Sequence, residues 1–168
     1  MAEFLVVMGV AGCGKSTLGR VVADHCGLPL LEGDDFHSDA NRQKMARGEA
    51  LTDADRTGWL AALCEQLRAH TRGVVLTCSA LKRAYREQLR LAAPGLRFVF
   101  LEISENDAQA RVSSRAGAHF FVASLVGSQF ATLQSPAGEP GVLTVDAMAP
   151  LPHLQAQVSA WLTHRETA

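Results

Sequence analysis

Residues 9–16 of this chain read Gly9-Val10-Ala11-Gly12-Cys13-Gly14-Lys15-Ser16. Two glycines separated by four residues and followed by Lys and Ser form the pattern of a phosphate-binding loop, whose backbone N–H groups surround phosphate oxygens. The apolar run at 4–8 predicts a buried strand before the loop, and the apolar positions within 17–23 predict a helix after it. A strand, a glycine loop and a helix N-terminus together attract an anion. The segment therefore predicts a nucleoside triphosphate site.

The loop residues have different expected roles. Lys15 is expected to act as a catalytic cation that reaches the outer phosphates, and Ser16 to ligate Mg²⁺. Cys13 lies near a helix N-terminus, where thiol pKa values fall, so a redox-sensitive loop is one interpretation. We prefer to interpret Cys13 as a small residue at a variable loop position. The predicted nucleotide-binding residues of this segment are Gly9, Val10, Ala11, Gly12, Cys13, Gly14, Lys15, Ser16 and Thr17.

Length and composition exclude several classes of protein. The 168 residues suit one domain over 1–168, and contents of 48% hydrophobic and 20% charged residues are ordinary for a globular protein. A formal net charge of −1 gives no field that would attract nucleic acid or an anionic membrane. No apolar run approaches the roughly 20 residues that span a bilayer, and the four cysteines form no CxxC pair. We expect a cytoplasmic protein that binds neither nucleic acid nor membrane.

Apolar runs alternate with helical patterns along the chain. Strands are predicted at 4–8, 29–32, 74–78, 98–103 and 141–146, and helices at 17–23, 41–47, 52–70, 82–91, 105–114 and 152–164. This alternation predicts an α/β fold, a doubly wound, five-stranded parallel sheet flanked by helices. Because ligands of such sheets bind at the carboxyl ends of the strands, residues 32–35, residues 78–82 and Asp146 become candidates for the site.

Two classes of phosphate-loop protein compete at this point: a switch or motor that hydrolyses nucleotide, and a kinase with a small-molecule acceptor. A GTPase needs an Asn/Thr-Lys-x-Asp segment that reads guanine, and the sequence has none. Asp55-Arg56-Thr57-Gly58 matches the Asp-x-x-Gly of GTPase switches, but it lies within a helical pattern and we interpret it as coincidence. The acidic strand end of motor ATPases has only a late counterpart at 142–146. The sequence therefore favours a kinase.

Blocks of residues through most of the chain make this prediction specific. They read Glu32-Gly33-Asp34-Asp35-Phe36-His37, Asn41-Arg42-Gln43-Lys44-Met45-Ala46-Arg47-Gly48, Leu51-Thr52-Asp53-Ala54-Asp55-Arg56, Cys78-Ser79-Ala80-Leu81-Lys82-Arg83-Ala84-Tyr85-Arg86, and His119-Phe120-Phe121 with Ser128-Gln129-Phe130. The chain resembles bacterial gluconokinases of the phosphate-loop type, relatives of shikimate kinase and the nucleoside monophosphate kinases. The resemblance implies phosphorylation of D-gluconate to 6-phospho-D-gluconate with ATP and Mg²⁺. It also implies a homodimer and a helical lid over about residues 111–133.

The acidic group after the second strand supplies the acceptor chemistry. Asp34 is the first choice for the carboxylate that orients the attacking hydroxyl and accepts its proton. Glu32 lies two residues earlier, on the same side of an extended segment, and is expected to hold a Mg²⁺-bound water. The pattern of many relatives at this position resembles Asp-x-Asp, and Glu32 departs from that pattern. Asp35 is expected to share either role.

A sugar-acid acceptor carries a carboxylate, which calls for Arg or Lys. Lys82 and Arg86 are four residues apart and are expected on one helix face beyond the third strand. Further substrate-binding candidates are Arg42, Lys44 and Arg56, and His37 is expected to bond a substrate hydroxyl. Trp59 is assigned to packing.

Two arginines lie at the end of the helix predicted at 105–114. In related kinases the equivalent region is a lid that closes over ATP, so Arg111 and Arg115 are predicted to bind the nucleotide phosphates and Arg115 to assist catalysis. Ala118 looks like an extra residue relative to the usual spacing, which leaves the register at His119 open. Two alternatives stay open: a kinase of another small anion, such as shikimate or a nucleoside monophosphate, and a nucleotide-hydrolysing regulator.

Overall fold

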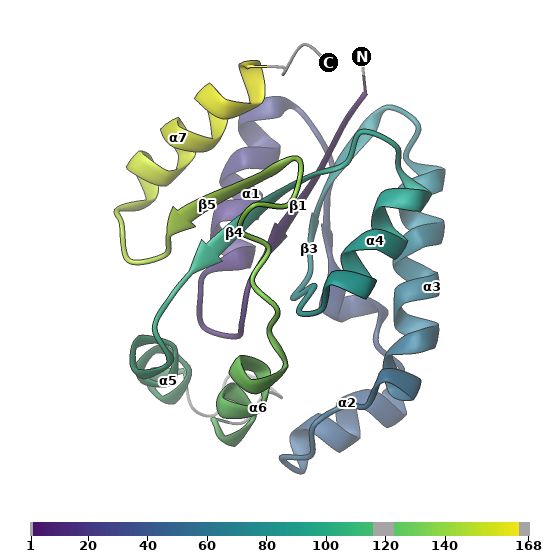
Figure 1. Ribbon diagram of the computed structural model, residues 1–168, viewed down its shortest axis with the longest axis vertical. Helices are drawn as coiled ribbons and strands as arrows, with labels where there is room; N and C mark the ends of the chain where they lie inside the picture. Colours follow the sequence, from purple (N-terminus) through teal and green to yellow (C-terminus); the bar gives the residue numbers. More distant parts are fainter. Residues whose placement is uncertain (1, 116–122, 165–168) are drawn as a thin grey trace.

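The computed structural model describes residues 2–115 and 123–164, and it confirms the predicted parallel sheet (Figure 1). Five strands lie in the order β2-β3-β1-β4-β5, and every neighbouring pair is parallel. Their bounds are β1 Glu3–Met8, β2 Leu30–Glu32, β3 Gly73–Thr77, β4 Arg97–Glu102 and β5 Val142–Asp146. Because β1 is central, the loop that follows it lies at the middle of the carboxyl edge, with β3 and β4 on its two sides.

Helices cover both faces of the sheet. Their bounds are α1 Lys15–Cys26, the 3₁₀ turn η1 Gly33–Phe36, α2 Asp39–Ala46, α3 Asp53–Ala69, α4 Arg83–Ala92, α5 Glu105–Ser114, α6 Ser124–Thr132 and α7 Leu151–Thr163. Helices α1 and α7 pack on one face, and α3 and α4 on the other (Figure 1). Helices α2, α5 and α6 lie beyond the carboxyl edge of the sheet, around the site.

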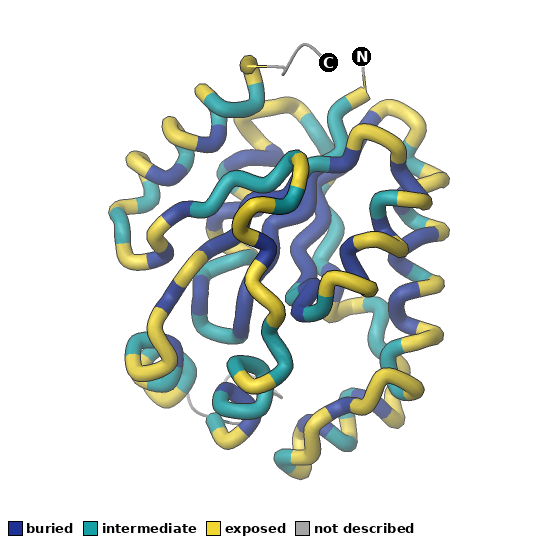
Figure 2. The backbone as a smooth tube through the Cα atoms, in the orientation of Figure 1, coloured by how far each residue is buried: buried dark blue, intermediate teal, exposed yellow. Residues whose placement is uncertain are grey.

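The strand alternation separates two apolar cores, and Figure 2 shows that buried positions concentrate along the central strands. In β1, Leu5 and Val7 face α1 and α7, while Val6 and Met8 face α3 and α4. All four side chains are fully buried, as expected for the central strand of a parallel sheet. Among the described residues, a third and much smaller cluster consists of Met45, Leu51 and Leu125, and it joins α2 and the loop before α3 to α6.

Capping residues set the starts of α2 and α3. The Ser38 hydroxyl accepts from the Asn41 N–H at 3.1 Å, so α2 begins at Asp39, two residues before the predicted start. Thr52 and Asp55 form a reciprocal capping box at the start of α3. Asp55 and Gly58 therefore lie inside a helix, which confirms that their resemblance to a GTPase switch is coincidental.

The predicted lid over 111–133 is described only in part. The end of α5 and the whole of α6 belong to it, whereas residues 116–122, and with them the register at His119, lie outside the described residues. In the described ranges, none of the helices has the length and apolar character needed to cross a membrane.

Candidate functional site

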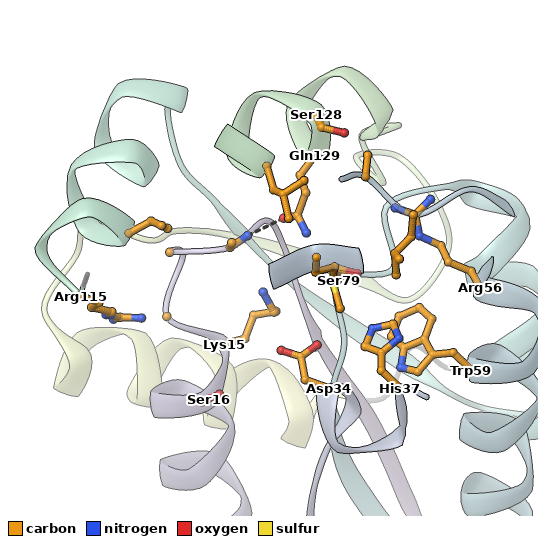
Figure 3. Close-up of a pocket in the computed structure, with 18 of the residues that line it drawn as sticks. Lys15, Ser16, Asp34, His37, Arg56, Trp59, Ser79, Arg115, Ser128 and Gln129 are labelled. Atoms are coloured by element: carbon orange, nitrogen blue, oxygen red, sulfur yellow. Dashed lines mark hydrogen bonds between the residues drawn. The ribbon is translucent and has the colours of Figure 1, made fainter. Parts of the chain in front are cut away.

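A cavity of about 190 Å³ lies at the carboxyl edge of the sheet, between the loop after β1 and the helices α2, α3, α5 and α6 (Figure 3). Its walls come from segments far apart in the sequence. The described residues that line it are Ala11, Gly12, Gly14, Lys15, Ser16, Thr17, Asp34, His37, Met45, Ala50, Leu51, Arg56, Trp59, Ser79, Val112, Arg115, Leu125, Ser128 and Gln129. Three of them, Lys15, Arg56 and Arg115, carry positive charge.

The glycine loop forms the floor of the cavity. Gly12 adopts a φ of +84°, and a Cβ there would lie 2.9 Å from the Ala108 carbonyl oxygen, so this close approach of the loop to α5 requires glycine. The Lys15 ammonium donates to the carbonyls of Gly9 and Val10 at 3.0 and 3.1 Å. The loop is therefore wrapped around its own lysine.

Several loop residues support the floor without reaching the cavity. Gly9 and Val10 do not line it, and the Cys13 side chain is buried against Gly9. Burial raises the pKa of the Cys13 thiol, with Lys15 acting weakly in the opposite direction. Buried thiols are less reactive than exposed ones, so the burial of Cys13 favours the packing interpretation.

Ser16 and Glu32, the residues predicted to hold Mg²⁺, are hydrogen-bonded to each other. The Ser16 hydroxyl donates to the Glu32 carboxylate at 2.9 Å, and the Thr77 hydroxyl donates to the same oxygen at 2.5 Å. Ser16 keeps its oxygen lone pairs available while its proton is bonded to Glu32. Mg²⁺ prefers such hard oxygen ligands and keeps several waters when a substrate phosphate is present, so these residues fit the ion.

Asp34 is placed by the backbone around it. A Cβ on Gly33 would lie only 2.3 Å from the Thr77 carbonyl oxygen, so η1 presses directly against the end of β3. The Trp59 indole N–H donates to the Gly33 carbonyl at 2.8 Å, and Arg42 donates to the Asp34 carbonyl at 2.8 Å. The Asp34 side chain lines the cavity (Figure 3), whereas Asp35, for which a shared role was predicted, does not line it.

His37 stands on the acceptor side of the cavity, stacked on Trp59. The ring centroids are 4.5 Å apart and the planes differ by 11°. Burial, reinforced by Arg42 and Arg56 against the opposing Asp34, lowers the pKa of His37 to about 4. The imidazole is therefore neutral at pH 7, a donor or acceptor for a hydroxyl and not a charged partner for a carboxylate.

Arg56 is the predicted acceptor-side cation that does reach the cavity. It donates to the Tyr85 hydroxyl at 3.2 Å. The two lysines that were predicted to bind the acceptor form ion pairs within the protein instead. Lys82 pairs with Asp53 at 2.9 Å, and Lys44 pairs with Asp55 at 2.6 Å. Neither lysine lines the cavity, and both hold the start of α3 in place.

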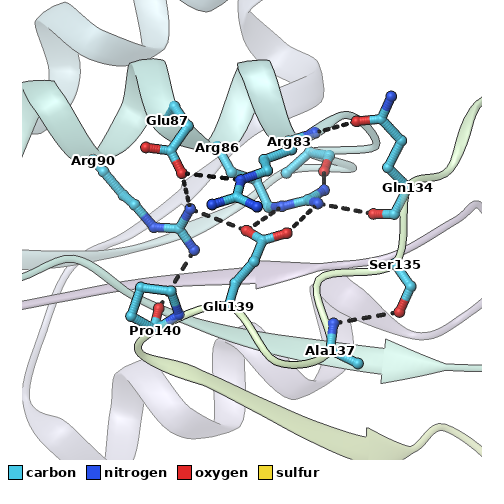
Figure 4. Close-up of polar contacts among 10 residues, drawn as sticks. Arg83, Arg86, Glu87, Arg90, Gln134, Ser135, Ala137, Glu139 and Pro140 are labelled. Carbon is cyan, nitrogen blue, oxygen red and sulfur yellow. Dashed lines mark hydrogen bonds and ion pairs between the residues drawn. The ribbon is translucent and has the colours of Figure 1, made fainter.

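The structure corrects the prediction for Arg86 (Figure 4). Its side chain is fully buried and donates to the Ala80 carbonyl at 2.6 Å and to the Glu139 carboxylate at 2.6 Å. Lys82 is the N-cap of α4, outside the regular helix, so the two cations do not share one exposed face. The buried positions Tyr85 and Leu89 flank the face that Arg86 occupies, and this apolar spacing was the sequence signal for its burial.

Arg111, in the last turn of α5, and Arg115, the C-cap of this helix, take different positions. Arg115 lines the cavity, as its predicted contact with nucleotide phosphates requires. Arg111 does not line it. Its guanidinium donates to the carbonyls of Gly12 and Cys13 at 3.2 and 3.4 Å and to the Ala147 carbonyl at 3.1 Å, so it braces the loop from behind.

Sequence reasoning missed four polar or aromatic wall residues: Trp59, Ser79, Ser128 and Gln129. Trp59 was assigned to packing, and it is buried, but its ring also forms the surface on which His37 rests. Gln129 accepts a hydrogen bond from the Ala11 N–H at 2.7 Å. The blocks 78–86 and 128–130 pointed to the segments that carry Ser79, Ser128 and Gln129, without indicating a role for any of them.

Comparisons with known proteins agree with this geometry. A family model described as an AAA domain matches residues 4–137. A gluconokinase of Gluconobacter oxydans is 47% identical over 146 residues, which cover 85% of this chain and 82% of the relative. The chain belongs to the gluconokinase family. The predicted family resemblance is thereby confirmed, together with the kinase class that the sequence favoured over a switch or motor.

Solved structures extend the gluconokinase match to the fold. A gluconokinase from Sinorhizobium meliloti 1021 has a TM-score of 0.84 at 44% identity, covering 96% of this chain and 95% of that one. A sugar kinase from Janibacter sp. HTCC2649, in an unliganded structure, has a TM-score of 0.92 at 40% identity, covering 97% and 95%. The gluconokinase family thus accounts for nearly the whole length of the chain.

Proposed function

We propose that the protein transfers the γ-phosphoryl group of ATP to a hydroxyl of D-gluconate, giving ADP and 6-phospho-D-gluconate. One observation carries the proposal: a single cavity places the phosphate-loop residue Lys15 opposite Asp34 and Arg56. A phosphate-binding floor facing a carboxylate and a guanidinium is suited to phosphoryl transfer onto an anionic polyol. The names of the relatives supply the identity of the acceptor.

Each side of the cavity has a distinct task. Loop amides and Lys15 hold the triphosphate, and Arg115 offsets charge on its outer oxygens. Asp34 orients the acceptor hydroxyl and takes its proton as the new O–P bond forms and the bond to ADP breaks. Arg56 pairs with the gluconate carboxylate, and neutral His37 bonds a hydroxyl. In this assignment Lys44, Lys82 and Arg86 are not substrate ligands, because ion pairs within the protein occupy them.

Mg²⁺ would be held by the Ser16 hydroxyl oxygen, with the Glu32 carboxylate beside it to accept from the hydroxyl and from bound water. When bound, the ion neutralises negative charge on the nucleotide phosphates. Thr77 keeps the Glu32 carboxylate in place from the neighbouring strand.

A coupled assay of ADP release tests the proposal. The acceptors compared are D-gluconate, other sugar acids, shikimate, nucleoside monophosphates and none. We expect ADP release to depend on D-gluconate and the product to be 6-phospho-D-gluconate. Release stimulated by shikimate or a nucleoside monophosphate instead would favour another kinase of this fold. Slow ADP release that no acceptor stimulates would indicate a nucleotide-hydrolysing regulator. Either result would overturn the assignment.

A further inference from the structure

Helix α6 reaches the phosphate-binding loop through one side chain. The Ala11 N–H donates to Gln129 Oε1 at 2.7 Å, although the two residues are 118 positions apart. A backbone N–H can only donate, so the amide oxygen of Gln129 must face the loop. Its NH₂ group then points away from Ala11, and Figure 3 shows Gln129 extending from α6 toward the region above Lys15.

Hydrogen bonds attach the chain just after α6 to neighbouring segments. The Gln134 N–H donates to the Leu81 carbonyl at 2.8 Å, and the Gln134 side-chain oxygen accepts from the Arg83 N–H at 2.8 Å. Buried Arg86 donates to the Gln134 carbonyl at 2.8 Å (Figure 4). These contacts tie the chain just after α6 to the loop that carries Ser79 and to the start of α4. Gln129 thus lies on a helix whose C-terminal end is attached to the acceptor side of the cavity, while its own side chain contacts the phosphate-binding loop.

Among the described residues, the Gln129 NH₂ group has no hydrogen-bond partner, and the charges around it indicate what it can bind. It faces a cavity whose described lining contains the cations Lys15 and Arg115 and the anion Asp34. The phosphoryl group in transit brings negative oxygens that require preorganised donors. A neutral amide whose oxygen is already bonded to the loop can donate there without rearrangement and without repelling the acceptor carboxylate.

We propose that Gln129 is a further catalytic residue, whose Nε2–H donates to an oxygen of the phosphoryl group being transferred while its Oε1 stays on the Ala11 N–H. No proton leaves the amide, and the bonds that form and break are those of the transfer itself. The inference rests on the proposed function for the identity of the acceptor only. It also implies that Ala11 acts on the nucleotide through Gln129, so the triphosphate is bound by the other loop amides.

The variant Gln129→Glu separates this role from a structural one. A carboxylate of the same shape still accepts from the Ala11 N–H, but it loses the donor and places negative charge toward the phosphoryl group. We expect kcat to fall about 10²–10³-fold, as for loss of one preorganised donor. The Kd for ATP should rise at least tenfold, the Kd for ADP should change less than threefold, and the melting temperature should hold.

Gln157→Glu on the exposed face of α7 makes the same change of charge away from the cavity, and it should match the wild type in every measurement. Gln129→Met removes both the donor and the acceptor without adding charge, and we expect its kcat to fall at least tenfold. This second variant tests the inference if Gln129→Glu folds poorly. A kcat within threefold of wild type in either Gln129 variant would overturn the inference. The Kd values for ATP and ADP are measured without an acceptor. Their comparison therefore tests Gln129 even if D-gluconate is the wrong substrate.

Discussion

His37 shows how neighbouring side chains fix the state of one residue. The Asn41 amide nitrogen donates to the Asp55 carbonyl at 2.9 Å and lies 3.4 Å from His37 Nδ1. Because a carbonyl only accepts, the atom of Asn41 near His37 is a donor, and Nδ1 must be the unprotonated nitrogen. The proton of the neutral ring is then on Nε2, available to an acceptor hydroxyl. Sequence alone identified His37 as a candidate but could not give its tautomer.

The low pKa of His37 predicts a pH dependence of stability. In the unfolded chain the imidazole takes up a proton below about pH 6.5, whereas in the folded protein it does so only near pH 4. Between these values the unfolded state binds more protons, so stability is lost as the pH falls. We expect His37→Gln to lose less stability than the wild type between pH 6.5 and pH 4, measured by urea denaturation. Equal losses in the two proteins would contradict the buried, neutral imidazole.

Asp34 and Asp35 offer a matched pair of substitutions. Asp34→Asn removes the base in the cavity, and we expect kcat to fall about 10²–10⁴-fold while ATP affinity stays near normal. Asp35→Asn changes an adjacent carboxylate that does not line the cavity, and it should retain kcat within threefold. Steady-state kinetics with ATP binding by calorimetry checks both. Near-normal turnover of Asp34→Asn would rule out its role as the base.

At the scale of elements, Arg111 in the last turn of α5 and Arg115, the C-cap of that helix, have different expected roles. Arg115→Ala should lower kcat about 10²-fold or more, by loss of a charge that faces the phosphates, with little change in KM for D-gluconate. Arg111→Ala should chiefly weaken nucleotide binding, because the carbonyls of Gly12 and Cys13 lose their brace. Kinetics together with ADP binding separates the two effects. Identical profiles for the two variants would contradict this division.

The loop at residues 135–141, before β5, has a structural role that no sequence pattern indicated. Residues 135–141 read as an irregular loop, yet the Glu139 side chain is 7% exposed and pairs with both Arg86 and Arg90 (Figure 4). Glu139→Ala leaves the fully buried Arg86 without its anion, and we expect a loss of about 3–5 kcal/mol in unfolding free energy. Glu49→Ala, which breaks an exposed pair with Arg47, should show no measurable change in the same urea titration. A Glu139→Ala protein as stable as the wild type would show that the buried pair is not needed.

Local patterns explain which elements the sequence could predict. The buried strands, the Thr52 cap and the glycine loop each follow from residues close together in the chain, so their positions were predicted to within a few residues. Arg86 and Glu139 are 53 positions apart, and their pairing depends on how α4 meets the loop before β5. The same holds for Gln129 and Ala11. Contacts of this kind are consequences of the assembled sheet and have no local spacing to reveal them.

Across the whole molecule, the strand order β2-β3-β1-β4-β5 brings the functional segments together. The loop after β1 lies between the ends of β3 and β4, so the phosphate floor has the Ser79 loop on one side and α5 on the other. The position of the site at the carboxyl edge could be predicted from the α/β pattern alone. The cytoplasmic location and the homodimer both stay predictions. Sedimentation velocity tests the oligomeric state.

Stability should be uneven across this molecule. The strands β1 and β3 are buried between two large apolar cores. Helix α2, by contrast, contributes one buried apolar side chain, Met45, which packs in the small cluster with Leu51 and Leu125. Few buried apolar contacts mean a low free energy of local opening. In native-state hydrogen exchange, amides of α2 should exchange at least tenfold faster than those of β1. Uniform protection would contradict this expectation.

The three-residue cluster also bears on how product leaves the enzyme. Met45, Leu51 and Leu125 all line the cavity, and α2 has no residue in either large core, so a movement of α2 away from Leu125 widens the cavity while the sheet and both large cores stay intact. Product release then needs only a small local rearrangement at each turnover. Substitutions of these three side chains should therefore change the lifetime of the product complex. A larger apolar residue there would slow release, and a smaller one would speed it, at positions that take no part in the phosphoryl transfer.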